Sequence, residues 1–229
     1  MKNTLLNMIL VLGGITLVAS AGVGLVYKVT EEPIRIAKEA NTKLALGDVL
    51  PDFDKSSSAE MQLDGIDIVV YTAEKSGKPV GYAVQTATKK GFSGEFKLMV
   101  GFTPDGKVYN VKVLEHAETP GLGDKMAAEG NPLFRSFEGR NPSQMKLAVT
   151  KDGGDVDALT AATITSRAYV DAVARAFNAM MEVTGGQSVE ADVDAESGAT
   201  EVDGESAATS ADAASGATKQ TEGKEGGDE

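Results

Sequence analysis

Residues 66–88 read IDIVVYTAEKSGKPVGYAVQTAT and predict the centre of the fold. Two runs rich in β-branched and aromatic residues, 66–73 and 80–88, flank the turn residues 76–79. Apolar runs of this length, separated by Ser, Gly and Pro, are typical of a β-hairpin. We therefore expect an antiparallel sheet built outward from this hairpin.

Two more strands are expected over 96–102 and 108–114, because a Pro-Asp-Gly turn separates them. In the second of these runs, Tyr109, Val111 and Val113 alternate with polar residues. This alternation predicts that all three side chains face the core of the domain.

Two helices are expected to pack against the sheet. Apolar residues recur at helical spacing over 31–46, where Pro33 fits a first helical turn. They recur again over 170–181, ahead of a stop at Gly185. The fold class is therefore α+β, an antiparallel sheet with packed helices.

The N-terminal segment is a candidate membrane anchor. Residues 5–27 contain no charged side chain, and a helix needs about 20 apolar residues to cross a bilayer. A cleaved signal peptide is the alternative, but the apolar run exceeds the roughly 7–15 residues of a signal core. We expect residues 1–30 to form a retained single-pass transmembrane helix in contact with membrane lipid.

The flanking charges bear on the orientation of this anchor. One basic residue precedes the apolar segment and four follow it: Lys2, then Lys28, Arg35, Lys38 and Lys43. The positive-inside rule would place the following domain in the cytoplasm, although long domains can translocate regardless of charge.

The C-terminal residues 187–229 contain twelve acidic and two basic residues and no Leu, Ile, Phe or Tyr. Such a segment cannot bury enough apolar surface to offset the entropy lost on ordering, so we expect a disordered acidic low-complexity tail. Residues 31–186 then form one domain of ordinary size.

Composition excludes several classes of protein. The net charge of -12 argues against nucleic-acid binding, which requires an excess of Lys and Arg. A chain without Cys has no disulfides, thiolate nucleophile or iron–sulfur cluster, and its single His cannot build a His-rich metal site.

Two stretches carry more polar and turn-forming residues than a scaffold requires. Residues 116–123 read HAETPGLG and follow a predicted strand. They form either a tight turn or a loop that approaches a planar ligand closely, since Gly121 and Gly123 have no side chain to block contact. His116 has a plainer interpretation, because a single His at a strand end is often only a hydrogen-bonded polar group.

The second stretch, residues 157–166, reads DALTAATITS and opens the predicted C-terminal helix. One of its hydroxyls could cap this helix. Four hydroxyl residues within 160–166 exceed that need, and a helix N-terminus favours a phosphate.

Residues 160–165, TAATIT, resemble the covalent flavin-attachment motif Ser/Thr-Gly-Ala-Ser/Thr-x-Ser/Thr of the FMN-binding domain family. Ala161 departs from this motif, which has Gly there. With the 116–123 loop and the N-terminal helix, the chain is similar to the G subunits of Rnf electron-transport complexes. The homologous C subunits of Na+-translocating NADH:quinone oxidoreductases are their nearest neighbours.

The resemblance implies a covalent FMN whose phosphate a flavin transferase esterifies to Thr165. By the same resemblance, five further residues would surround the cofactor: Glu118, Thr119, Leu122, Thr163 and Ser166. No side chain would act as a catalyst during turnover, because the cofactor carries the redox chemistry.

For the complex, the resemblance implies electron transfer from reduced ferredoxin to NAD+, coupled to Na+ or H+ translocation. This chain would relay electrons among other membrane subunits, with its main domain on the extracytoplasmic (periplasmic) side of the cytoplasmic (inner) membrane, contrary to the charge count. The alternatives are the corresponding subunit of a Na+-translocating NADH:quinone oxidoreductase, a noncatalytic membrane-tethered assembly subunit and a stand-alone extracytoplasmic flavoprotein.

Overall fold

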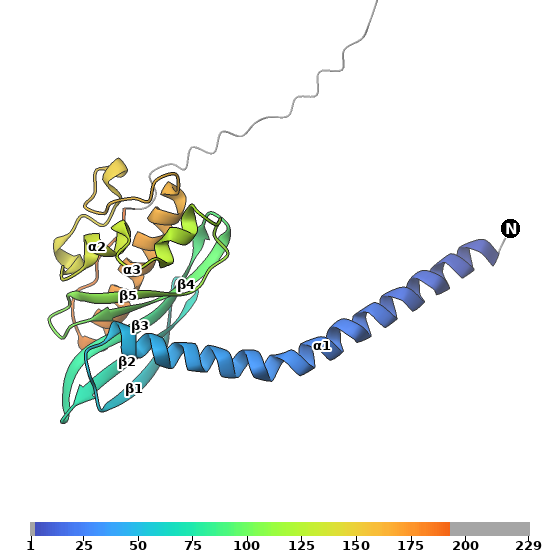
Figure 1. Ribbon diagram of the computed structural model, residues 1–229, viewed down its shortest axis with the longest axis horizontal. Helices are drawn as coiled ribbons and strands as arrows, with labels where there is room; N and C mark the ends of the chain where they lie inside the picture. The colour runs from blue at the N-terminus through green and yellow to red at the C-terminus, as the bar shows by residue number, and fades with distance from the viewer. Residues whose placement is uncertain (1–2, 193–229) are drawn as a thin grey trace, which may run out of the picture. The chain divides into compact units, whose positions relative to one another are not determined.

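The computed structural model describes residues 3–192, so the predicted tail from residue 193 onward lies outside the described residues. The main elements, in chain order, are α1 (Asn3–Val49), β1 (Lys55–Leu63), β2 (Ile66–Lys75), β3 (Lys78–Gly91), β4 (Gly94–Phe102), β5 (Val108–Glu115), α2 (Pro132–Phe137) and α3 (Thr163–Thr184) (Figure 1). Short 3-10 turns lie between the last three: η1 (Gly123–Ala127), η2 (Pro142–Gln144) and η3 (Thr150–Asp152).

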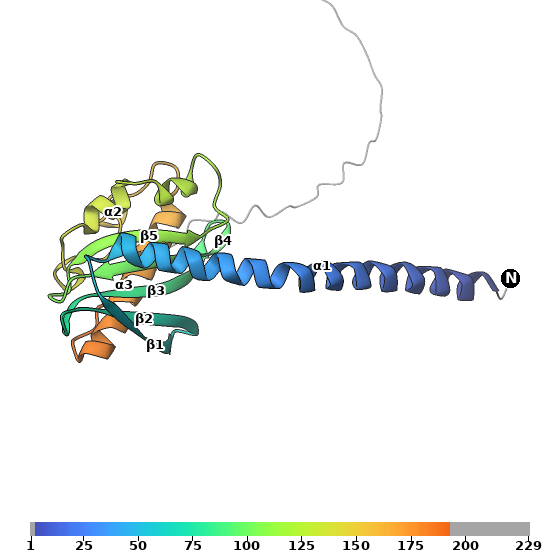
Figure 2. The same ribbon diagram turned by 60° about the horizontal axis from the view of Figure 1, so that its bottom comes forward.

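The sheet is a five-stranded antiparallel meander with the order β1-β2-β3-β4-β5 (Figure 2). The predicted hairpin is β2–β3, and Ser76 and Gly77 both have positive φ at its turn. This backbone matches the twist of paired strands. Strand β1 was missed because its sequence, KSSSAEMQL, begins with a polar run and only its short second half alternates, and its residues are mostly exposed at the sheet edge.

The predicted burial of Tyr109 is wrong, while Val111 and Val113 pack against the core as expected. Phe102 pairs with Val108 and Gly101 pairs with Asn110, so Tyr109 is the extra residue of a β-bulge. A bulge breaks the two-residue alternation of a strand, which leaves the Tyr109 side chain exposed.

Helix α3 covers one face of the sheet. Val170, Val173 and Phe177 from the predicted apolar face are fully buried, and the Phe177 ring meets Phe102 edge-on at 5.9 Å between centroids. The helix ends at Gly185 in the left-handed conformation, as predicted.

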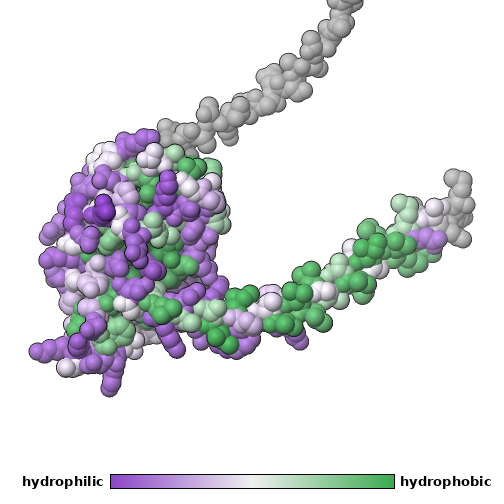
Figure 3. Space-filling view, in the orientation of Figure 1, coloured by the Kyte–Doolittle hydropathy of each residue, from purple (hydrophilic) through white to green (hydrophobic). Residues whose placement is uncertain are grey.

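The two N-terminal helices predicted from sequence form one continuous helix of 47 residues, and Pro33 lies inside it rather than in a first turn. A proline removes one backbone hydrogen bond from a helix interior. Near Pro33, Arg35 forms exposed ion pairs with Glu32 and Glu39 along the helix, each of which adds only about 0.2–0.5 kcal/mol to helix stability. The helix is long and apolar enough to cross a membrane, and apolar side chains gather on its N-terminal half (Figure 3).

The last turns of α1 cover the other face of the sheet. Leu46, Val49 and Leu50 pack there against the small side chains of β2 and β3 and against Met99. A Cβ at Gly101 would collide with the Val49 carbonyl oxygen. The helix can therefore lie against β4 only because this position has no side chain.

Candidate functional site

A cavity of about 280 Å³ brings the two predicted stretches together. It lies where the β3–β4 turn, the loop after β5 and the start of α3 meet. Its lining residues are Phe92, Glu118, Thr119, Leu122, Gly123, Ala161, Ala162, Thr163, Ile164 and Thr165. Four of the five residues expected beside the cofactor thus line the same cavity as Thr165.

Glu118 and Thr165 form the polar centre of this cavity. The Thr165 hydroxyl donates a hydrogen bond to Glu118 Oε2 at 3.0 Å, and the Ser93 backbone N–H donates to Glu118 Oε1 at 3.3 Å. Thr165 is 1% exposed and Glu118 is 5% exposed. Within residues 3–192, no Lys, Arg or His forms an ion pair with Glu118. A hydroxyl held by a carboxylate is the arrangement that activates an oxygen nucleophile.

Gly123 permits this close packing. A Cβ at this position would lie 2.6 Å from Glu118 Oε2 and 2.8 Å from Thr165 Oγ1. Gly121 has a different reason to be glycine, because its φ is +79° with open space around it. The loop therefore folds directly over the Thr165 hydroxyl.

The start of α3 carries no side-chain cap. Its N-cap residue is Ala162, so none of the hydroxyls of 157–166 caps the helix in the ordinary way. The first N–H groups of any helix lack an intrahelical acceptor and favour an anion. In α3 these N–H groups belong to the first turn, whose residues line the Thr165 cavity.

Ser166 has a separate task in the same turn. Its hydroxyl accepts a hydrogen bond from the Leu159 N–H at 3.0 Å and donates to the Ala162 carbonyl at 2.8 Å. Ser166 is fully buried and does not line the cavity. It fastens residues 159–162 to α3 and so shapes the site from behind; direct contact with a cofactor stays a prediction.

Ala161 occupies a strained conformation. Its φ is +59°, the left-handed region that glycine adopts at little cost. The glycine of the flavin-attachment motif therefore suits this backbone better than the alanine present here.

The structure separates the other predicted residues into two groups. Thr119 and Leu122 line the cavity, and the Thr119 carbonyl accepts the Leu122 N–H at 3.1 Å within the turn. His116 is exposed directly after β5 and does not line the cavity. Sequence reasoning missed Phe92 and Ile164, which do; a large aromatic in the tight turn Gly91–Gly94 was the available signal for Phe92.

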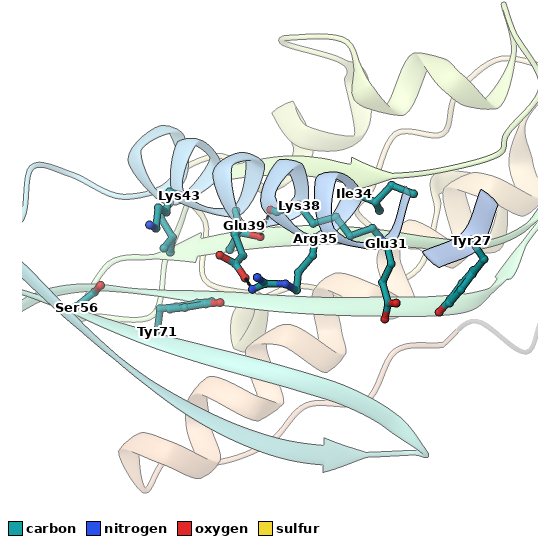
Figure 4. A pocket seen from close by; sticks show the side chains of 11 residues that line it. Tyr27, Glu31, Ile34, Arg35, Lys38, Glu39, Lys43, Ser56 and Tyr71 are labelled. Carbon is teal, nitrogen blue, oxygen red and sulfur yellow. Dashed lines mark hydrogen bonds and ion pairs between the residues drawn. The ribbon is translucent and has the colours of Figure 1, made fainter. Parts of the chain in front are cut away.

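A larger cavity of about 740 Å³ lies between α1 and strands β1 and β2 (Figure 4). Arg35 pairs there with Glu39 at 2.6 Å, while Ser56 and Tyr71 face the helix from the sheet. Burial raises the pKa of Tyr71 above its ordinary value. None of the predicted cofactor residues lines this cavity, so it is not the candidate site.

Comparison with known proteins identifies the domain that contains the Thr165 cavity. Residues 91–178 match the FMN-binding domain family, and this segment spans the cavity from the Phe92 turn to α3. The G subunit of the ion-translocating oxidoreductase complex of Shewanella loihica is 32% identical over 212 residues, covering 86% of this chain and 100% of that protein. The protein of the same name from Vibrio cholerae is 35% identical, over 73% of this chain and 86% of its own.

A third relative has higher identity over a shorter segment. The corresponding G subunit of Erwinia tasmaniensis is 48% identical over 109 residues, 46% of this chain and about half (52%) of that protein. The relative from Shewanella loihica, by contrast, aligns along its whole length. The chain therefore belongs to the family of G subunits of ion-translocating oxidoreductase complexes and contains an FMN-binding domain.

Proposed function

We propose that this membrane-anchored chain holds FMN through a phosphoester to Thr165 and relays electrons within an ion-translocating oxidoreductase complex. The observation that carries the proposal is the buried Thr165 hydroxyl, 3.0 Å from the Glu118 carboxylate, inside the cavity of an FMN-binding domain. Bound FMN would supply one-electron chemistry, and the chain would supply attachment, orientation and electrostatics.

The residues present fit the parts of FMN. The N–H groups at the start of α3 and the Thr163 hydroxyl would hold the phosphate, where the helix dipole favours negative charge. Thr119 and Leu122 would border the rest of the cofactor. Ser166 would keep the 159–162 turn in place behind the phosphate.

Glu118 would act during maturation rather than turnover. Its carboxylate is placed to orient the Thr165 hydroxyl and accept its proton as the oxygen attacks the FMN phosphorus of FAD, with AMP leaving, in the active site of a flavin transferase. Because Thr165 is 1% exposed and lies beneath Gly123, the 118–123 loop would move aside for the transferase.

The complex would transfer electrons from reduced ferredoxin to NAD+ and move Na+ or H+, with those substrates bound by other membrane subunits. The names of the relatives support this complex over a Na+-translocating NADH:quinone oxidoreductase. We expect no turnover from the chain alone.

We further propose that the domain lies on the extracytoplasmic side of the membrane. Since the chain has no cysteine, a single Ser57→Cys variant on exposed β1 gives one labelling site. A membrane-impermeant maleimide should label it in intact spheroplasts. Labelling only after lysis would place the domain in the cytoplasm.

Mass spectrometry of the denatured protein from its native host tests the attachment. An FMN-sized adduct is expected on the peptide that contains Thr165; it should disappear in Thr165→Ala and persist in Thr165→Ser. Thr184→Ala makes the same change at the far end of α3 and serves as the matched control. A wild-type protein without an adduct would contradict the covalent relay and favour a noncatalytic assembly subunit.

A further inference from the structure

Three large apolar side chains surround the Thr165 cavity without being buried. Phe92, Leu122 and Ile164 are 65%, 40% and 38% exposed and come from the β3–β4 turn, the loop after β5 and the first turn of α3. Among residues 50–192, only two other large apolar side chains are exposed, Tyr109 and Val183. Three of five therefore gather at one cavity, although they belong to three separate segments.

The volume of the cavity indicates which part of the cofactor needs an apolar surface outside it. Its volume of about 280 Å³ lies just below the range of roughly 300–1,000 Å³ that is usual for drug-sized ligands. A cofactor attached at the Thr165 hydroxyl would therefore extend beyond the cavity, and its ring system would lie at the rim beside the three apolar side chains.

We propose that Phe92, Leu122 and Ile164 form a seat for the isoalloxazine ring, with the Phe92 ring stacked on the flavin. The inference rests on the proposed FMN attachment and adds residues that position the ring. Aromatic rings prefer offset stacked or edge-to-face contact, and an exposed phenylalanine gains more from covering a flat ring than from facing water.

The turn that carries Phe92 is fixed to the attachment site. The Ser93 N–H donates to Glu118 Oε1, and a Cβ at Gly91 would lie 2.8 Å from the same oxygen. Glu118 Oε2 meanwhile holds Thr165. One carboxylate thus sets the position of the stacking residue relative to the attachment residue.

The chemistry of the seat follows from its apolar character. Apolar side chains on one side of the ring exclude water from that side and leave the opposite side open. The open side is then available for electron exchange with another subunit. Removing Phe92 should uncover the ring without cutting the cofactor loose, because attachment depends on Thr165.

The test uses the full-length protein isolated with its native transferase and compares the wild type with Phe92→Ala. We expect the FMN adduct to persist, the visible circular dichroism of the flavin to be lost, and iodide quenching of flavin fluorescence to rise roughly twofold as a second ring face opens. Phe92→Tyr should restore both signals. Tyr109→Ala removes an exposed aromatic away from the cavity and should change neither.

The outcomes separate the two proposals. A loaded Phe92→Ala protein with unchanged dichroism and quenching would overturn the ring seat while the attachment stands. A wild type without flavin would overturn both. Phe92→Leu keeps an apolar side chain without the flat ring. Dichroism and quenching intermediate between those of the wild type and Phe92→Ala would identify the contribution of ring stacking. Wild-type values in Phe92→Leu would overturn the stacking part of the proposal.

Discussion

Two buried carboxylates, Asp171 within α3 and Glu118 beside its first turn, have different kinds of partners. Asp171 accepts hydrogen bonds from the Thr88 hydroxyl at 3.0 Å, the Lys90 ammonium at 3.1 Å and the Arg175 guanidinium at 2.8 Å. Glu118 receives one hydroxyl and one backbone N–H, and its surroundings open into a cavity.

The difference separates a structural group from a chemical one. The charge of Asp171 is neutralised by Lys90 of β3 and by Arg175, one turn further along α3, and Arg175 also donates to the Ala87 carbonyl of β3. The partners of Asp171 are therefore all used in holding the fold. Glu118 is paired with a neutral hydroxyl whose proton it can accept. A buried carboxylate without a cation is therefore the better marker of the site on this domain.

Removing the charge of Asp171 should have the largest effect on stability. Asp171→Asn leaves the buried Arg175 guanidinium with only the exposed Asp64 as an anion, and breaking a buried pair costs about 3 kcal/mol of unfolding free energy. Thermal and urea unfolding in detergent measure this loss. The protein that remains folded should still carry FMN on Thr165; a loss below about 1 kcal/mol would mean that the cluster is not a structural clamp.

The same change from carboxylate to amide at Glu118 should affect stability only slightly and FMN attachment strongly. Glu118→Gln keeps the shape and removes the charge, so we expect a stability loss of only about 1–2 kcal/mol. The fraction of chains with the FMN adduct should fall sharply, because the amide accepts a proton far less readily. Intact-mass spectra measure this fraction. Full loading would show that Glu118 only supports the turn.

Relieving the strain at Ala161 should give a smaller, favourable effect. Ala161→Gly allows the observed φ of +59° at lower cost, and we expect a gain of about 1 kcal/mol in unfolding free energy. Urea denaturation compares the variant with Ala162→Gly, the neighbouring residue, whose φ is negative. A gain at both positions would point to a cause other than the positive φ.

The smallest effect concerns a third carboxylate, Asp152, which joins the loop before the site to α3. Two hydrogen bonds from Arg167, at 2.7 and 2.8 Å, lower the pKa of Asp152 below its ordinary value. This stabilisation is therefore complete above the ordinary carboxyl pKa of about 4 and is lost as the pH falls through the lowered value.

Thermal midpoints measured from pH 7 down to pH 3 test this dependence. Asp152→Asn should be less stable than the wild type at pH 7, and the difference should shrink toward pH 3. A constant difference between the two proteins would show that the ion pair does not titrate in this range.

The sequence predicted most of the sheet and α3 because both bury regular apolar patterns. It missed β1 because a serine-rich edge strand buries little, and it divided α1 because a proline is more typical of a first helical turn than of the helix interior where Pro33 lies. For the site, the glycines of residues 116–123 and the hydroxyl residues of 157–166 identified the two loops. Phe92 and Ile164 were not found, since their common position depends on three segments meeting in space.

The contact between α1 and the sheet determines where a soluble fragment can begin. The last turns of α1 are continuous with the anchor helix, but their apolar side chains pack on Ala73, Ala83 and Met99 of the sheet. A fragment that starts after Val49 would bare this apolar surface and aggregate. A fragment that starts near Thr42 keeps the cover and omits the apolar half of the helix, which makes it the better choice for crystallisation.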